Sequence, residues 1–400
     1  MKIKLIVCLV LLANTFFGQR IAESIETKNI GTRTFTVVTP PSYESNSEKK
    51  YPTLLLLDGE YLLDPFEGAL KYGNYWDDLP EMIIVAVNQN NGDTRFSDSE
   101  FDDAGFPSGT GAQFFEFLGQ ELFPYLESKY RTLPFRVIAG HDTTAGFLNF
   151  YLYKDNPVFN AYISLAPEMA PEMENRIADR LSKITKPIFY YQATGESDLS
   201  EINENAAALD TNIKAIPNPK FSYLNDAFKG ASHYSLVVKA IPNALYFIFD
   251  GYQPISMIEF QQKIMPLEAG YTDYLIKKYT DLNAKLGLQI KPRLSDFKAI
   301  EAAIMKNKAF GEFQTLATYA NKHYPKTILG TYHQAMYYEK TGNFKKALKE
   351  YQKAFTQEEV RELTKEFMLN KAEALKGKED NPTEEAPTLT PTEAPAEKQE

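Results

Sequence analysis

The chain has 400 residues, more than one hydrophobic core ordinarily serves, so we expect a large domain and a smaller one. Hydrophobic residues make up 44% and charged residues 24%, which is typical of a globular protein. The 43 basic and 53 acidic residues give a formal net charge of −10. No cluster of Lys and Arg stands out, which argues against a nucleic-acid surface or a polybasic membrane contact. A small molecule or another protein is the expected partner.

The first 18 residues have the pattern of a signal peptide. Lys2 and Lys4 precede the apolar run Leu5–Phe17, and Gly18 follows as a small residue near the expected cleavage site. The run is shorter than the roughly 20 residues of a spanning helix, and no later segment is long and apolar enough. We therefore expect export to the periplasm or the medium, with no transmembrane segment in the mature chain. The only cysteine, Cys8, lies inside this leader, so the mature chain would form no disulfide.

Residues 19–253 alternate apolar, β-rich runs with helical stretches. This pattern predicts an α/β domain with a mostly parallel sheet and helices on both faces. Several runs are almost entirely apolar, as strands buried on both faces should be. Expected strands are Arg33–Thr39, Thr53–Leu57, Met82–Val87, Arg136–Ala139, Ala161–Leu165, Pro187–Ala193 and Lys220–Leu224; expected helices include Gly111–Tyr130, Phe147–Tyr153, Leu199–Ala208 and Leu236–Phe249.

Residues 254–376 show continuous helical periodicity, which predicts a separate all-helical domain. Within it, residues near 328–361 are similar to a tetratricopeptide repeat, a two-helix unit. The matching small and aromatic positions are Ala335, Tyr338, Gly342, Ala347, Tyr351 and Ala354. Two interpretations stay open: a helical hairpin packed on the first domain, or a groove that binds a peptide. Residues 377–400 are rich in Pro, Thr and Glu without a hydrophobic period, so we expect a disordered tail.

The segment Arg136–Gly146 carries the main chemical signal. An apolar strand runs into small residues and then into a helix, which is the setting of the nucleophile elbow G-x-S-x-G. Gly140 matches the first glycine, Asp142 occupies the position of the serine, and Thr144 occupies that of the second glycine. Aspartate tolerates left-handed dihedral angles better than most residues, so the turn can survive. A side chain at Thr144 implies a widened or rebuilt elbow, because glycine serves close helix–strand approach there.

With Gly140 and His141, the elbow resembles the G-H-S-x-G-G of the putative-esterase family, which includes enterochelin esterases and S-formylglutathione hydrolases. Leu54–Gly59 resembles the apolar strand of that family, which ends in Asp-Gly. Thr94 and Arg95 with Glu100 resemble its arginine-bearing loop, although an arginine in a polar loop more often forms a local salt bridge. Further matches are Glu121–Pro124 and Tyr130–Thr132. The resemblance covers roughly residues 32–252 and implies an α/β-hydrolase fold with esterase ancestry.

In that fold an acid and then a histidine follow the nucleophile, each on a loop beyond a strand. His233 lies in the context that the family uses for its catalytic histidine, whereas the resemblance gives His141 only a lining role. The acid is Asp198 by preference, with Glu196 as the alternative. The other interpretation of either carboxylate is a turn residue or a helix cap.

An oxyanion hole would use backbone N–H groups, which survive side-chain substitution. The resemblance places these donors at Thr143 and near Gly59 and Glu60. Ser232 and Ser235 beside His233 are conceivable replacement nucleophiles, but neither lies in an elbow.

Aspartate nucleophiles occur in the haloalkane dehalogenase and epoxide hydrolase branches of this fold, where they attack a saturated carbon. Attack on an ester would give an anhydride, a poor intermediate. The lone Trp76 cannot be assigned as a leaving-group donor. We therefore favour a protein that has lost catalysis and binds an ester-like small molecule, or a protein or peptide through its helical domain. The alternative is an active hydrolase of altered mechanism that uses Asp142, His233 and Asp198. The sequence contains no metal-binding or phosphate-binding motif, and we expect no cofactor.

Overall fold

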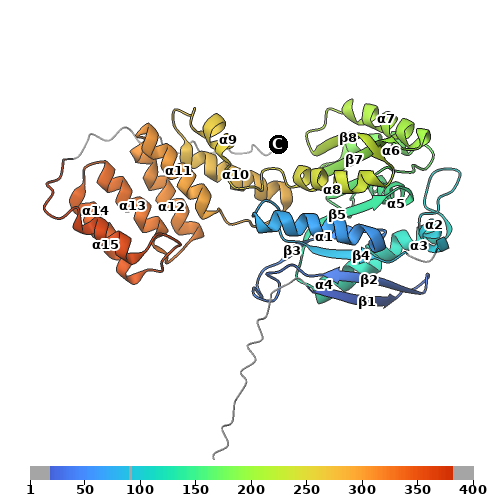
Figure 1. Ribbon diagram of the computed structural model, residues 1–400, viewed down its shortest axis with the longest axis horizontal. Helices are drawn as coiled ribbons and strands as arrows, with labels where there is room; N and C mark the ends of the chain where they lie inside the picture. Colours follow the sequence, from blue (N-terminus) through green and yellow to red (C-terminus); the bar gives the residue numbers. More distant parts are fainter. Residues whose placement is uncertain (1–18, 90–91, 382–400) are drawn as a thin grey trace, which may run out of the picture. The chain divides into compact units, whose positions relative to one another are not determined.

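The computed structural model describes residues 19–89 and 92–381. The predicted signal peptide (residues 1–18) and most of the predicted disordered tail lie outside the described residues. The chain divides between Tyr252 and Gln253 into two compact units, one α/β and one helical (Figure 1). None of the helices that the structure describes combines the length and apolarity needed to cross a membrane.

The first unit is built on an eight-stranded sheet with the order β1-β2-β4-β3-β5-β6-β7-β8. Strands β3 to β8 run parallel to one another, while β2 pairs antiparallel with both β1 and β4. This is the α/β-hydrolase fold, as predicted. The strands are β1 (Arg20–Glu26), β2 (Thr32–Val38), β3 (Tyr51–Leu56), β4 (Ile83–Val87), β5 (Thr132–His141), β6 (Ala161–Leu165), β7 (Ile188–Ser197) and β8 (Phe221–Ser232).

Helices cover both faces of the sheet. Helices α1 and α8 contact each other on one face. On the other, apolar side chains of β2 to β7 form one core cluster with those of α3, α4, α6, α7 and the turns η1 and η2. The helices of this unit are α1 (Gly59–Tyr75), α2 (Gly92–Asp98), α3 (Gly109–Phe117), the π-helical turn η1 (Leu118–Leu122), α4 (Phe123–Lys129), α5 (Thr143–Phe147), the 3₁₀ turn η2 (Leu148–Tyr153), α6 (Met173–Lys183), α7 (Ser200–Lys214) and α8 (Ser235–Ile248).

Several boundaries differ from the predicted ones. The helix expected at Phe147–Tyr153 begins four residues earlier, at Thr143, so it starts directly at the elbow. Strands β7 and β8 continue past their expected ends, because their polar ends pair with each other as far as Ser197 and Ser232. The edge strand β1 was not predicted.

The second unit is helical and has its own hydrophobic core. Helices α13 and α14 form a hairpin in the region predicted to resemble a tetratricopeptide repeat, and α12 also packs against α13. The helices are α9 (Met257–Glu259), the π-helical turn η3 (Phe260–Ile264), α10 (Tyr271–Leu286), α11 (Leu294–Asn307), the 3₁₀ turn η4 (Phe310–Glu312), α12 (Phe313–His323), α13 (Ile328–Lys340), α14 (Phe344–Lys353), the 3₁₀ turn η5 (Ala354–Thr356) and α15 (Lys365–Glu373).

Candidate active site

Asp142 stands at a sharp turn between β5 and α5. Its φ of 61° and ψ of −123° are strained for a residue with a side chain, a strain that costs on the order of 1–3 kcal/mol. The surrounding backbone holds this turn in place. The Asp142 N–H donates to the carbonyl of Leu165 at 2.9 Å, and its carbonyl accepts from Gly146 at 3.0 Å and Glu168 at 3.2 Å. The elbow therefore keeps a nucleophile-type backbone although its side chain is a carboxylate.

Two glycines allow the close packing of this elbow. A Cβ atom at Gly140 would lie 2.8 Å from the carbonyl carbon and oxygen of Thr144. A Cβ atom at Gly146 would collide with the carbonyl oxygen of Glu168. Strand β5 therefore lies close to α5 at Gly140, and α5 lies close to the segment after β6 at Gly146.

Thr144, at the position of the motif's second glycine, is fully buried. Its hydroxyl donates to Asp58 Oδ2 at 2.6 Å and accepts from the His141 N–H at 3.0 Å. Asp58 is the residue just before α1, and its own backbone is left-handed, with φ 54°. The Thr144 side chain therefore connects the elbow to the residue before α1.

Arg95, on α2, contacts two carboxylates, those of Asp58 and Asp142. Its Nε donates to Asp58 Oδ1 at 2.6 Å, one terminal nitrogen lies 3.3 Å from Asp142 Oδ2, and the other donates to the His141 carbonyl at 2.8 Å. Burial lowers the pKa of the guanidinium, but the hydrogen bond and the charge of Asp58 outweigh it and raise that pKa above its ordinary value. Arg95 forms the salt bridge with Asp58 that an arginine in a polar loop was expected to form, and it also pairs with Asp142 at a longer distance. The sequence placed Asp58 in the Asp-Gly end of the matching strand but gave it no role in the site.

Asp198 and His233 are brought together by the paired ends of β7 and β8. Ser197 and Ser232, the last residues of the two strands, are register partners. Asp198 and His233 follow them directly and therefore lie side by side. His233 Nδ1 is 2.8 Å from Asp198 Oδ1, and the Asp198 side chain is buried. The alternative acid, Glu196, accepts instead from the Gly230 N–H at 2.7 Å.

His233 Nε2 lies 3.8 Å from Asp142 Oδ1, which forms an ion pair when the imidazole carries both protons. Asp198 also accepts from the Leu199 N–H at 2.9 Å, so it contacts the start of α7 as well. His233 therefore lies between Asp142 and Asp198 and contacts both carboxylates through different ring nitrogens.

His141 is almost fully buried and lies against the His233 loop. Its Nε2 lies 3.0 Å from the His233 carbonyl, its Nδ1 lies 3.2 Å from the Tyr61 hydroxyl, and its ring centroid is 4.4 Å from that of His233. Burial, together with the charge of His233, lowers the pKa of His141. These contacts suit a residue that positions the His233 loop.

The expected oxyanion donors lie at two helix N-termini. Thr143 is the first residue of α5, and its hydroxyl donates to Glu168 at 2.8 Å. Gly59 begins α1 where a Cβ atom would lie 2.7 Å from the Val87 carbonyl oxygen, and Glu60 accepts from the Gln89 N–H at 2.6 Å. The Thr144–Asp58 bond holds these two helix ends together, which is the arrangement that two backbone donors would require.

Other candidates from the sequence lie outside this arrangement. Ser232 and Ser235 bond to each other, with 3.2 Å between their hydroxyls, and within the described residues neither hydroxyl is hydrogen-bonded to the His233 ring. Trp76 caps the far end of the 17-residue helix α1, about 25 Å from Gly59 at the helical rise per residue. Within the described residues, no group of three or more His, Cys, Asp or Glu side chains is arranged to hold a metal ion.

Comparison with known proteins defines the class of the first unit. Residues 28–213 match the model of the Esterase family, described as putative esterase. Residues 28–213 are therefore similar to the putative-esterase family, within a unit that has the α/β-hydrolase fold and is followed by a helical unit.

An uncharacterised protein from Capnocytophaga ochracea is 28% identical, with a TM-score of 0.81 over 89% of this chain and 99% of that chain. This coverage extends beyond the α/β unit, so the helical unit is matched as well. An IroE-like serine hydrolase from Shewanella oneidensis is 19% identical, with a TM-score of 0.58 over 76% of this chain and 99% of that chain, and shares the fold. The BES protein from Bacillus cereus is 19% identical, with a TM-score of 0.50 over 57% of this chain and 95% of that chain. No curated protein matched the sequence.

Proposed function

We propose that this protein is an exported member of the esterase-like class that has lost ester hydrolysis and acts as a binding or scaffold protein. The observation that carries the proposal is the ion pair of Asp142 with Arg95 at the elbow, at 3.3 Å. A carboxylate paired with a guanidinium is a weakened nucleophile, and its attack on an ester carbonyl would give an anhydride. Arg95 is held by Asp58 and the His141 carbonyl, so it cannot easily leave Asp142.

The parts of the site that are retained support the loss of an earlier catalytic activity, rather than a site that was never catalytic. The Asp198–His233 hydrogen bond and the helix N-termini at Thr143 and Gly59 are the parts that do not depend on the residue at position 142. An ester-like small molecule is the ligand that such a remnant would recognise. A protein or peptide at the helical unit is the other candidate partner.

An active hydrolase of altered mechanism is the second candidate function, and the retained elbow backbone with its nearby histidine favours it. In that mechanism a carboxylate oxygen of Asp142 attacks a saturated carbon and expels the leaving group. Water activated by His233 then hydrolyses the resulting ester and restores the carboxylate.

The test compares the purified wild type with Asp142→Ala and Asp142→Asn on short-chain esters, haloalkanes and epoxides. Asn keeps the shape of the side chain and removes its charge. Loss of catalysis predicts that all three proteins are inert on every panel. Turnover by wild type that both substitutions abolish would instead establish Asp142 as the nucleophile or base. Wild-type ester turnover that survives both would point to another nucleophile, and Ser232→Ala and Ser235→Ala would then identify it.

A further inference from the structure

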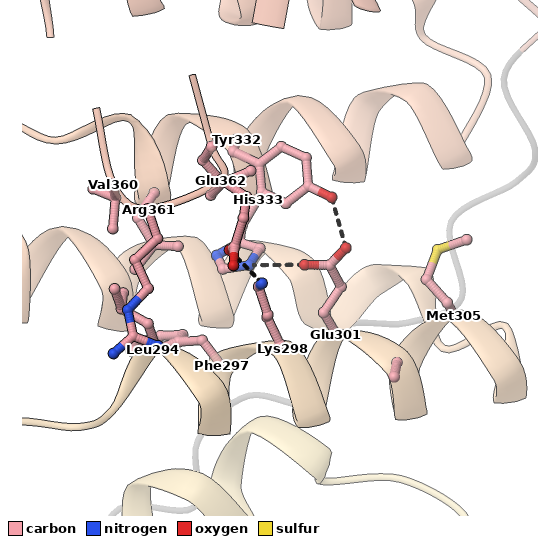
Figure 2. A pocket seen from close by; sticks show the side chains of 13 residues that line it. Leu294, Phe297, Lys298, Glu301, Met305, Tyr332, His333, Val360, Arg361 and Glu362 are labelled. Carbon is pink, nitrogen blue, oxygen red and sulfur yellow. Dashed lines mark hydrogen bonds and ion pairs between the residues drawn. The ribbon is translucent and has the colours of Figure 1, made fainter. Parts of the chain in front are cut away.

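The helical unit contains a pocket of about 250 Å³ between α11, α13 and the turn at residues 360–363 (Figure 2). This volume is just below the roughly 300 Å³ at which drug-sized sites begin, so it suits a small ligand or the end of a long side chain. Most of the lining is apolar, from Leu294, Phe297, Met305, Leu329, Val360 and Leu363.

Glu301 is the acidic group inside this pocket, and it rises from α11 towards α13 (Figure 2). The Tyr332 hydroxyl donates to Glu301 Oε1 at 2.6 Å. The other oxygen, Oε2, lies 3.6 Å from His333 Nε2, too far for a hydrogen bond, and among the described residues it has no closer donor. Burial raises the pKa of Glu301, but His333, Tyr332 and the charge of Lys298 together lower it by more, so this pKa lies below its ordinary value.

His333 shows that the polar contacts of the pocket are incomplete. Its side chain is 1% exposed and lies between the rings of Phe297 and Phe313, with centroids 5.9 and 6.2 Å away. Its Nδ1 has no hydrogen-bond partner among the described residues. Buried polar atoms without partners are rare, because each costs on the order of 1–3 kcal/mol.

The cations that line the pocket lie at its rim. Lys298 Nζ pairs with Glu362 Oε2 at 2.5 Å, and both side chains are more than half exposed. Arg361 lies on the same turn and is exposed. The rim charges of Lys298 and Glu362 compensate each other, the exposed Arg361 adds one positive charge at the rim, and Glu301 is the acidic group that a ligand inside the pocket would meet.

We propose that this pocket binds an organic ammonium group, supplied by a small amine or by a lysine side chain of a partner protein. The ammonium donates to Glu301 Oε2, close to the aromatic ring of Tyr332, which adds a cation–π attraction. The alkyl chain packs against the apolar lining, including Phe297 and Met305.

The test is a calorimetric titration of the full chain with hexylammonium, hexanol and hexanoate, which share a chain length and differ in charge. The ammonium is expected to bind at least about tenfold more tightly than the other two, because a hydrogen bond to a charged group discriminates by that much or more. Two peptides test whether the ammonium group comes from a lysine side chain: Ac-Gly-Lys-Gly-NH₂ and its counterpart with norleucine, which lacks the ammonium group. Binding of the lysine peptide in preference to hexylammonium points to a partner protein, and the reverse points to a small amine.

Glu301→Gln keeps an acceptor for Tyr332 and removes the charge, so it should weaken ammonium binding by about tenfold or more. The double variant Lys298→Gln/Glu362→Gln is the control, since it removes both charges of the rim pair and leaves their sum unchanged, and it should leave binding within about twofold. The thermal midpoint of each variant checks folding. Equal or tighter binding of hexanoate, no binding of any amine, or an unchanged affinity in a folded Glu301→Gln protein would overturn the proposal.

Discussion

Asp142 has a φ of 61° and a side chain that lies between Arg95 and His233, at 3.3 and 3.8 Å. Thr144, two residues later, bonds to Asp58, which in turn holds Arg95. The two departures from the esterase motif are therefore linked through one network of contacts. The motif placed Asp142 at the elbow, but the network depends on Asp58 and Arg95, which are distant in sequence and whose contacts only the fold reveals.

Thr144→Val tests whether the hydroxyl stabilises the elbow. Valine has a similar shape but leaves Asp58 Oδ2 and the His141 N–H without this partner, so the free energy of unfolding should fall by about 1–3 kcal/mol. Urea denaturation measures the change. The control is Thr211→Val on the exposed face of α7, where the hydroxyl donates to the Ala207 carbonyl, and a change within about 0.5 kcal/mol is expected there. A loss at Thr144 no larger than at Thr211 would show that the link to Asp58 contributes nothing to stability.

The pH dependence of stability tests the environment of His141. Its pKa is lowered in the folded state by burial and by His233, while its neighbours Asp58 and Asp142 oppose this shift. The unfolded chain therefore takes up a proton first as the pH falls below about 6.5, and the folded state loses stability below that pH. Unfolding free energies from pH 8 to pH 5 should fall less steeply in His141→Gln than in wild type. Equal slopes would mean that His141 does not titrate abnormally.

At the scale of elements, the candidate site depends on where strands and helices end. The apolar runs predicted β2 to β8, because buried strands have few polar residues, but they could not predict the polar ends of β7 and β8. Those ends pair up to Ser197 and Ser232 and so bring Asp198 to His233. The edge strand β1 was missed because its burial alternates between half-buried and exposed positions and its sequence includes charged residues, as is common at sheet edges.

Gly146→Ala tests the close approach of α5 to the segment after β6. The new methyl group would collide with the Glu168 carbonyl, a backbone atom that cannot easily move, so a loss of about 1–3 kcal/mol is expected. Gly68→Ala in α1 is the control, because its Cβ atom would meet nothing within 4 Å. There a gain of up to about 1 kcal/mol is expected. If denaturation gave both variants the same stability, the proposed packing at Gly146 would be wrong.

At the scale of the molecule, the chain joins an esterase-like unit to a helical unit with a pocket of its own. Composition and periodicity were enough to predict both kinds of architecture. They could not predict the pocket, because Glu301 and Tyr332 lie on different helices and meet only after packing. The similarity of α13 and α14 to a tetratricopeptide repeat stays a prediction, as does export.

The most direct test of the central claim is ester hydrolysis by Asp142→Ser. If only the nucleophile was given up, serine at the strained elbow beside His233 should hydrolyse p-nitrophenyl acetate at least about a hundredfold faster than wild type, the scale of general-base catalysis. The double variant Asp142→Ser/His233→Ala should lose that gain. Wild-type hydrolysis that Asp142→Ser fails to increase would contradict the account, and so would a folded Asp142→Ser protein with no gain at all.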